Sequence, residues 1–508
     1  MKALIDSAIG LVLAVLIFVV IELVLGATGM GDALENTNWS RGFDTNAQYM
    51  VPDPEVEGGW LTHFRDKGRK ERPIAPKTEA RRVLLFGGSN TAGFPNWHLK
   101  NLLDEAAGNG DEFAVYNLGR EGYGSARVRI VFEQALENLD PDIVIIYAGH
   151  NEFVEMGFQM DLEAAGLSTT QTRLQAAARD TNLFRALVRA YTPDPAARSE
   201  GATSQRPEEW EWEYEKFKSI TYDQTKVQFD HYADNLRGMC RSARERGVDV
   251  MICTVVHNRM APPFSSTLPK DLSPERRTQY SEHFVAGNRL LPAFLKPLLP
   301  VREDERVHQK DYHSRGAYVP DQAAVLESMR PSHGYLADKQ AMHQKRDQWD
   351  PHVVAHDKAL ARFWARDIDA VQRAALEQAE SEYRAALAIV PDHPRALFEL
   401  ALVSYLLERD DSTVTQMLED AARFDRAPRK ATSYTNELVA QVASEIEGVQ
   451  LVDIDRVFRE SEEMEIVGWE WMADHCHVNR GGGMVVMELM AEALLEHWPA
   501  TRTEDEDH

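Results

Sequence analysis

Four short polar segments of the sequence carry side chains suited to nucleophilic catalysis. The segments are Gly87-Gly88-Ser89-Asn90, 117–125, Gly149-His150-Asn151-Glu152 and Asp474-His475-Cys476-His477. A serine hydroxyl becomes a nucleophile only when a nearby base accepts its proton, and a histidine base needs a carboxylate on its other ring nitrogen. Asp474 precedes His477 by three residues, about one turn. This spacing lets the carboxylate reach one imidazole nitrogen while the other faces Ser89.

The same segments supply donors for the charge that develops on an attacked carbonyl oxygen. Such donors must be fixed in advance, and backbone N–H groups or a side-chain amide serve well. The candidates are the N–H of Ser89 at a helix N-terminus, the N–H of Gly122 in a tight loop and the amide of Asn151. Glycine at position 122 lets the backbone approach a ligand closely. We therefore expect an oxyanion hole formed by Ser89, Gly122 and Asn151.

Taken in order, the four segments resemble the SGNH, or GDSL-type, hydrolases. The four family residues are Ser, Gly, Asn and His, and they fall here on Ser89, Gly122, Asn151 and His477. The resemblance implies a serine hydrolase acting on an ester, an esterase or an O-acetyltransferase, with no metal and no organic cofactor. The sequence departs from the family pattern at Gly88, where the family name has Asp, and at Glu152, where Asp is usual. Neither belongs to the triad, so the departures affect only the choice of sub-group.

The same residues also fit other roles. Ser89 is suited to capping a helix after a glycine turn. The four residues 474–477 (Asp, His, Cys and His) could instead ligate a metal, although the sequence has no second cluster of Cys or His at metal spacing nearby. His257 and Asn258 follow the fourth predicted strand. They are candidate substrate-binding residues, with a polar loop before Pro262-Pro263 as the alternative.

Apolar runs that alternate with amphipathic helical stretches must position these segments. The runs are Arg82–Phe86, Phe113–Leu118, Ile143–Ala148, Val248–Val256 and Val449–Ile454. Alternation of this kind predicts an α/β fold with a doubly wound parallel sheet, flavodoxin-like, in three α/β/α layers. Because ligands bind at the carboxyl ends of such strands, the polar segments after them are expected to meet.

Residues 1–30 predict a transmembrane signal anchor. The chain from Ala8 to Leu25 is apolar except for Gly10 and Glu22, and Lys2 precedes it. About 20 apolar residues cross a bilayer, and positive residues stay on the cytoplasmic side. We therefore expect a single-pass membrane protein with its catalytic domain outside the cytoplasm, a cleaved signal peptide being the alternative. Residues 31–80, rich in Pro and Gly without a sustained period, are expected to form a stalk and linker.

Two insertions are predicted within the hydrolase core, which itself spans 81–260 and 449–500. The first insertion covers about 153–235. The second, 261–448, contains a tetratricopeptide-like stretch at about 375–425, with Ala379, Tyr383, Ala386 and Pro391 at the spacing of that repeat. Because three or more repeats are normally needed to stack, this stretch is expected to act as a lid or as a docking module for a protein partner. An acidic tail, 501–508, ends the chain.

Composition excludes several classes of protein. The 508 residues include 56 Lys and Arg against 81 Asp and Glu, a formal charge of −25, which disfavours binding to nucleic acid. Three cysteines are too few for a disulfide scaffold, and whether Cys240 and Cys253 pair is left open. The expected function is a membrane-anchored esterase acting on an acylated envelope glycan or lipid. The alternative is a catalytically weak scaffold that binds envelope partners.

Overall fold

The computed structural model describes residues 2–28, 49–62, 72–108, 112–157, 181–183, 186–187, 222–264, 266, 268–299, 351–426, 428–462 and 464–498. The chain divides into two compact units. One comprises Met1–Ala75 and Met156–Glu215, and the other Pro76–Glu155 and Lys216–His508. The acidic tail 501–508 and most of the predicted insertion 153–235 lie outside the described residues.

The first unit contains helix α1 (Lys2–Ala27) and a small antiparallel sheet. Its strands, β1 (Met50–Pro52), β2 (Trp60–Thr62) and β3 (Arg72–Ile74), pair in that order. The predicted stalk therefore holds a sheet, and three-residue strands are too short to leave a period in the sequence.

Glu22 on α1 has partners within the first unit. Its carboxylate accepts hydrogen bonds from the backbone N–H groups of Asn182 at 2.6 Å and Leu183 at 2.8 Å. Among the residues with described positions, no helix is long and apolar enough to cross a membrane. The transmembrane helix predicted within residues 1–30 is therefore not supported by the structure.

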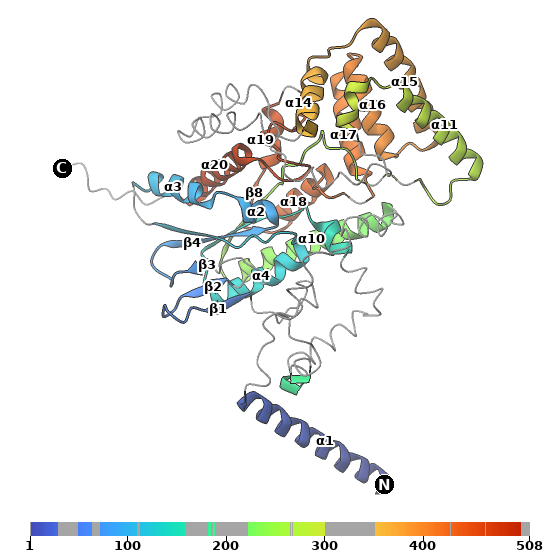
Figure 1. Ribbon diagram of the computed structural model, residues 1–508. Coiled ribbons are helices and arrows are strands. Elements are labelled where there is room, and N and C mark those ends of the chain that lie inside the picture. Colours follow the sequence, from blue (N-terminus) through green and yellow to red (C-terminus); the bar gives the residue numbers. More distant parts are fainter. Residues whose placement is uncertain are drawn as a thin grey trace, which may run out of the picture. The chain divides into compact units, whose positions relative to one another are not determined.

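The second unit is built on a five-stranded parallel sheet (Figure 1). Its strands are β4 (Arg81–Gly87), β5 (Phe113–Asn117), β6 (Ile143–Tyr147), β7 (Asp249–Cys253) and β8 (Val449–Val452). The spatial order is β5-β4-β6-β7-β8, and every pairing is parallel. This is the 2-1-3-4-5 order of doubly wound flavodoxin-like sheets, so the predicted parallel α/β fold is confirmed.

Helices cover both faces of this sheet because both faces are apolar. Helices α3 (Asn96–Ala106) and α20 (Arg480–His497) lie on one face, over side chains that include Val83 and Leu85. Helices α4 (Ser125–Asn138) and α10 (Tyr222–Glu245) lie on the other. There the Phe86 ring packs against that of Phe132, with centroids 4.8 Å apart. Continuous burial of this kind is typical of parallel strands.

The chain between β7 and β8 forms a helical module. Its described helices are α11 (Pro274–Leu290), the 3₁₀ helix η2 (Ala293–Leu298), α14 (Pro351–Trp364), α15 (Ala370–Ile389), α16 (Pro394–Leu406), α17 (Asp411–Arg423) and α18 (Ser433–Glu445). Apolar side chains of α14 to α17 share one core with residues of η2.

The predicted repeat positions Ala379, Tyr383 and Ala386 are buried on α15. Tyr383 faces a helix that the sequence did not reveal, α11, where its hydroxyl donates to Asn288 Oδ1 at 2.6 Å. Assignment of this region to the tetratricopeptide repeats stays a prediction.

Candidate active site

The end of β4 places Ser89 at the start of helix α2 (Ser89–Gly93). The turn needs glycine at position 87, because a Cβ there would lie 2.0 Å from the carbonyl oxygen of Tyr147 on the neighbouring strand. Ser89 Oγ lies 2.6 Å from Nε2 of His477, which is within hydrogen-bond reach. The structure thus brings the predicted nucleophile and base together from positions 388 residues apart.

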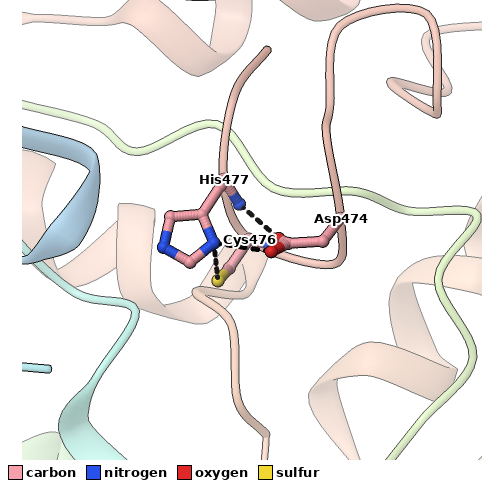
Figure 2. Close-up of side chains that lie close together, drawn as sticks. All are labelled: Asp474, Cys476 and His477. Atoms are coloured by element: carbon pink, nitrogen blue, oxygen red, sulfur yellow. Dashed lines mark hydrogen bonds and ion pairs between the residues drawn. The ribbon is translucent and has the colours of Figure 1, made fainter. Parts of the chain in front are cut away.

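The loop before α20 carries the other two predicted groups of the triad (Figure 2). His477 Nδ1 lies 2.7 Å from Asp474 Oδ2. The second carboxylate oxygen of Asp474 accepts the backbone N–H groups of Cys476 at 2.8 Å and His477 at 2.7 Å. Asp474 therefore shapes the turn and orients the imidazole at the same time.

Electrostatics in this loop favour an ionised carboxylate beside an imidazole that readily accepts a proton. Burial raises the pKa of Asp474, but the hydrogen bond from His477 and the charges of His475 and His477 outweigh it, and the pKa lies well below its usual range. Burial lowers the pKa of His477, yet its hydrogen bond to Asp474 and the charges of Asp474 and Glu121 leave the pKa raised. A more basic His477 is a better acceptor for the Ser89 proton.

Asn90 fixes the histidine loop to the nucleophile helix, a role that sequence reasoning missed. Its side-chain Nδ2 donates to the Cys476 carbonyl at 2.7 Å, and its Oδ1 accepts the Val478 N–H at 3.0 Å. Both partners flank His477, so Asn90 holds the base opposite its own neighbour Ser89. The only available signal was its position directly after the serine.

The predicted oxyanion donors lie around the same strand end. The side-chain amide of Asn151 donates to the Tyr123 carbonyl at 3.0 Å, which places Asn151 beside the Gly122 loop. A Cβ on Gly88 would lie 2.6 Å from Asn151 Nδ2, so the amide also lies against the residue before Ser89. Asn151 has a second amide hydrogen that can serve an oxyanion.

The backbone at Gly122 adopts φ +70°, the left-handed region that favours glycine. A Cβ there would meet nothing within 4 Å. The reason for glycine is therefore the backbone conformation rather than close approach to other protein atoms.

Two buried acidic side chains, Glu152 and Glu155, form hydrogen bonds next to the Gly122 loop. Glu152, the departure from the family pattern, accepts the N–H and hydroxyl of Ser125 at 2.9 and 2.6 Å. Glu155 accepts Arg127 Nε at 2.7 Å, and Arg127 Nη2 in turn donates to the Gly122 carbonyl. Burial, followed by the charge of Glu155, raises the pKa of Glu152 to about 8. Through Glu155 and Arg127 the N-terminus of α4 is linked to the Gly122 loop.

His257 and Asn258 are not exposed to a substrate. Both are fully buried. Asn258 Nδ2 donates to the Asp474 carbonyl at 3.1 Å, and neither ring nitrogen of His257 has a hydrogen-bond partner in the described structure. The structure therefore does not support the substrate-binding role predicted for these residues. Polar residues after a strand fit an internal network as well as a ligand site, and sequence alone does not separate the two.

Cys476 completes a group of possible metal ligands with Asp474 and His477. Their ligand atoms all lie within 4.8 Å of one another. A metal would take the thiolate, whereas burial and the charge of Asp474 raise the pKa of the Cys476 thiol well above its ordinary value. The donor set therefore fits a hydrogen-bonded triad better than a metal centre.

A family model matches part of the chain. Residues 85–312 match the model of the GDSL-like Lipase/Acylhydrolase family. This range includes Ser89, Gly122 and Asn151, while Asp474 and His477 lie beyond it and are brought to Ser89 by the fold. The comparison with curated proteins gave no match.

Two solved structures show partial similarity. One is a GDSL-like lipase from Bacteroides thetaiotaomicron VPI-5482, with 14% identity and a TM-score of 0.17, covering 35% of this chain and 51% of that one. The other is a candidate acylhydrolase from Bacteroides fragilis NCTC 9343, with 15% identity and a TM-score of 0.19, covering 45% of this chain and 62% of that one. The chain thus spans between half and two thirds of each.

Proposed function

Because residues 85–312 match the GDSL-like lipase/acylhydrolase model, we propose that the chain is a serine esterase whose triad is Ser89, His477 and Asp474. The observation that carries the proposal is the continuous chain of hydrogen bonds from Ser89 Oγ through His477 to Asp474, at 2.6 and 2.7 Å. Nucleophile, base and orienting carboxylate stand in the order that acyl transfer requires.

In the first half of the proposed reaction, Ser89 Oγ attacks the ester carbonyl carbon while His477 Nε2 accepts the hydroxyl proton. The oxyanion receives hydrogen bonds from Asn151 and from the N–H groups of Ser89 and Gly122. The carbon–oxygen bond to the alcohol then breaks, and His477 returns the proton to the leaving oxygen. An acyl group remains on Ser89.

In the second half, water attacks the acyl carbon while His477 accepts a proton from it. Collapse of the second tetrahedral intermediate breaks the bond to Ser89 Oγ, which recovers its proton from His477, and releases a carboxylic acid. If an acceptor hydroxyl replaces water, the same steps transfer the acyl group. The triad chemistry is the same for both outcomes.

The substrate proposed is an acyl ester on a cell-envelope glycan or lipid. Its support is the sequence pattern of residues 1–30, which favours attachment to a membrane with the hydrolase domain outside the cytoplasm. A reporter fused to the C-terminus should then be active only outside the cytoplasm, and the protein should stay with membranes after a carbonate wash. A reporter active in the cytoplasm contradicts this placement.

Labelling with a serine-directed fluorophosphonate tests the enzymatic proposal. The wild-type protein should be labelled and should hydrolyse an aryl acetate, and Ser89→Ala should do neither while keeping its circular dichroism spectrum. Ser281→Ala, which changes an exposed serine on α11, is the matched control and should behave as wild type. An unlabelled wild-type protein that retains a bound envelope partner would favour the scaffold function instead.

A further inference from the structure

A buried lysine of the helical module lies near the loop that carries Asp474 and His477. Lys430 lies between α17 and α18 and is 4% exposed. Its ammonium group donates to the backbone carbonyls of Asn258 at 2.6 Å and Ala261 at 2.9 Å. Both acceptors lie after β7, so the lysine joins an inserted segment to the end of a core strand.

Asn258 continues this connection into the loop that carries the base. Its Nδ2 donates to the Asp474 carbonyl at 3.1 Å, and its backbone N–H donates to the His475 carbonyl at 3.3 Å. Its Oδ1 accepts the Met260 N–H at 2.9 Å, which fixes the orientation of the side-chain amide. The path from Lys430 to Asp474 thus passes through one residue.

The residue after Lys430 contacts the other side of the site. The N–H of Ala431 donates to His150 Nδ1 at 3.0 Å, and His150 directly precedes Asn151. The inserted segment therefore touches both the loop that carries the base and the segment that carries an oxyanion donor.

We propose that Lys430 is a positioning residue for catalysis, which holds Asn258 and through it the Asp474–His477 loop. The inference rests on the proposed esterase function, because it assigns Lys430 no chemistry of its own. It gives the helical module a direct part in the geometry of the triad, beyond that of a lid or docking surface.

The charges around Lys430 set the pH range in which it can act. Burial lowers the pKa of Lys430 to about 8, against the opposing charges of Asp425 and Glu419, while Arg259 lowers the pKa further and Cys476 raises it. His150 and His257 also lie within electrostatic reach of the lysine. Lys430 is charged below about pH 8 and loses its proton above it, so its charge-assisted hydrogen bonds weaken as pH rises.

The test compares rates of fluorophosphonate labelling and of aryl acetate hydrolysis. Lys430→Met keeps most of the side chain without the ammonium group. It should lower kcat by roughly 10- to 100-fold with KM nearly unchanged, because it misplaces the loop that carries His477 and leaves the binding of a small ester intact. Lys358→Met, which removes an exposed lysine on α14, is the matched control and should leave both constants at wild-type values.

A pH series separates positioning by charge from a general structural role. Wild-type kcat should decline above about pH 8, and Lys430→Arg, which stays charged, should extend activity to higher pH. An unchanged alkaline limb in a folded Lys430→Arg protein would overturn the role of the charge.

The remaining outcomes also decide the question. Folded Lys430→Met with wild-type kcat overturns the inference. If that variant does not fold, Asn258→Ala replaces it. Fluorophosphonate labelling of Asn258→Ala at the wild-type rate then also overturns the inference. A wild-type protein that Ser89-directed reagents do not label refutes the esterase function itself, a result distinct from normal labelling of the lysine variants.

Discussion

The imidazole of His477 is held from both ends, by Asp474 on Nδ1 and Ser89 on Nε2. The carboxylate fixes which nitrogen carries the proton, and in the proposed reaction its charge stabilises the imidazolium that forms during attack. Because the pKa of His477 is raised, the enzyme should lose activity on the acid side at a higher pH than an ordinary histidine would dictate. Below its pKa the base is already protonated and cannot accept the serine proton.

Asp474→Asn should separate this electrostatic role from the structural one. The asparagine oxygen can still accept the N–H groups of Cys476 and His477, so the turn should persist. The amide cannot stabilise the imidazolium, and we expect kcat to fall roughly 10³- to 10⁴-fold. The acid limb of kcat/KM should move to lower pH, because the pKa of His477 loses its main positive contribution. An acid limb that does not move would assign the raised pKa to another group.

Gly88→Ala tests the packing of the oxyanion donor. The added Cβ would lie 2.6 Å from Asn151 Nδ2 and 2.9 Å from the Tyr123 carbonyl oxygen, so the amide must move. We expect kcat on a small ester to fall by about 10²-fold or more, as for loss of one oxyanion donor. Gly93→Ala, at the other end of α2 with nothing within 4 Å of the added atom, is the control. Equal activity of the two variants would place Asn151 outside the hole.

At the scale of elements, the strands of the parallel sheet were predictable to within a few residues. A strand buried on both faces leaves an uninterrupted apolar run, and the glycines after β4, β5 and β6 marked where each ends. Helix α11 was missed because its sequence has little apolar periodicity, with only Tyr280 and Gly287 fully buried. Its place in the fold becomes clear only in the structure, where it packs against α15.

The site, like the fold, contains residues that the sequence pattern reveals and residues that it does not. Contact between Ser89, Asp474 and His477 could be predicted because nucleophilic catalysis needs those residue types, and they stand at strand and helix ends. Asn90, Lys430 and the true place of Asn258 could not, because backbone carbonyls and N–H groups accept many polar partners. Such contacts depend on which loops meet, and that is decided by tertiary packing.

Tyr383→Ala should loosen the contact between α15 and α11. The phenol ring is fully buried and would lie 3.0 Å from a Cβ at Gly287, so α11 approaches it closely. Loss of the ring should cost about 3–5 kcal/mol of stability. Tyr383→Phe keeps the ring and removes the hydroxyl, which donates to Asn288, and should cost about 0.5–1.5 kcal/mol. Urea denaturation measures both, and equal losses would mean that the hydroxyl, not the ring, carries the contact.

At the scale of the whole second unit, one arginine connects the helical module to the sheet domain. Arg259 donates to Asp455 through both terminal nitrogens, at 3.1 and 3.0 Å, and its Nε donates to Glu419 on α17. Asp455 belongs to α19 (Ile454–Glu460), directly after β8. The insertion and the core are thus joined by a buried ionic network as well as by the chain.

Arg259→Ala should destabilise the unit by about 3–5 kcal/mol, because it leaves the Asp455 carboxylate buried without its main cation. Calorimetry should show a lower unfolding temperature. Arg373→Ala, which breaks an exposed pair with Glu408 at 3.0 Å, should change stability by about 1 kcal/mol or less. A similar shift for the two variants would show that the network contributes no more than a surface pair.

The three cysteines are free and buried, on α10, on β7 and beside His477. Burial raises the pKa of Cys240 to about 12 and that of Cys253 and Cys476 strongly upwards as well. Alkylating reagents attack thiolates, so each sulfur should react only when its surroundings open. The native chain therefore contains three built-in reporters of local unfolding. Mass spectrometry of alkylated peptides under mild denaturant would show whether the loop around His477 opens before the sheet does.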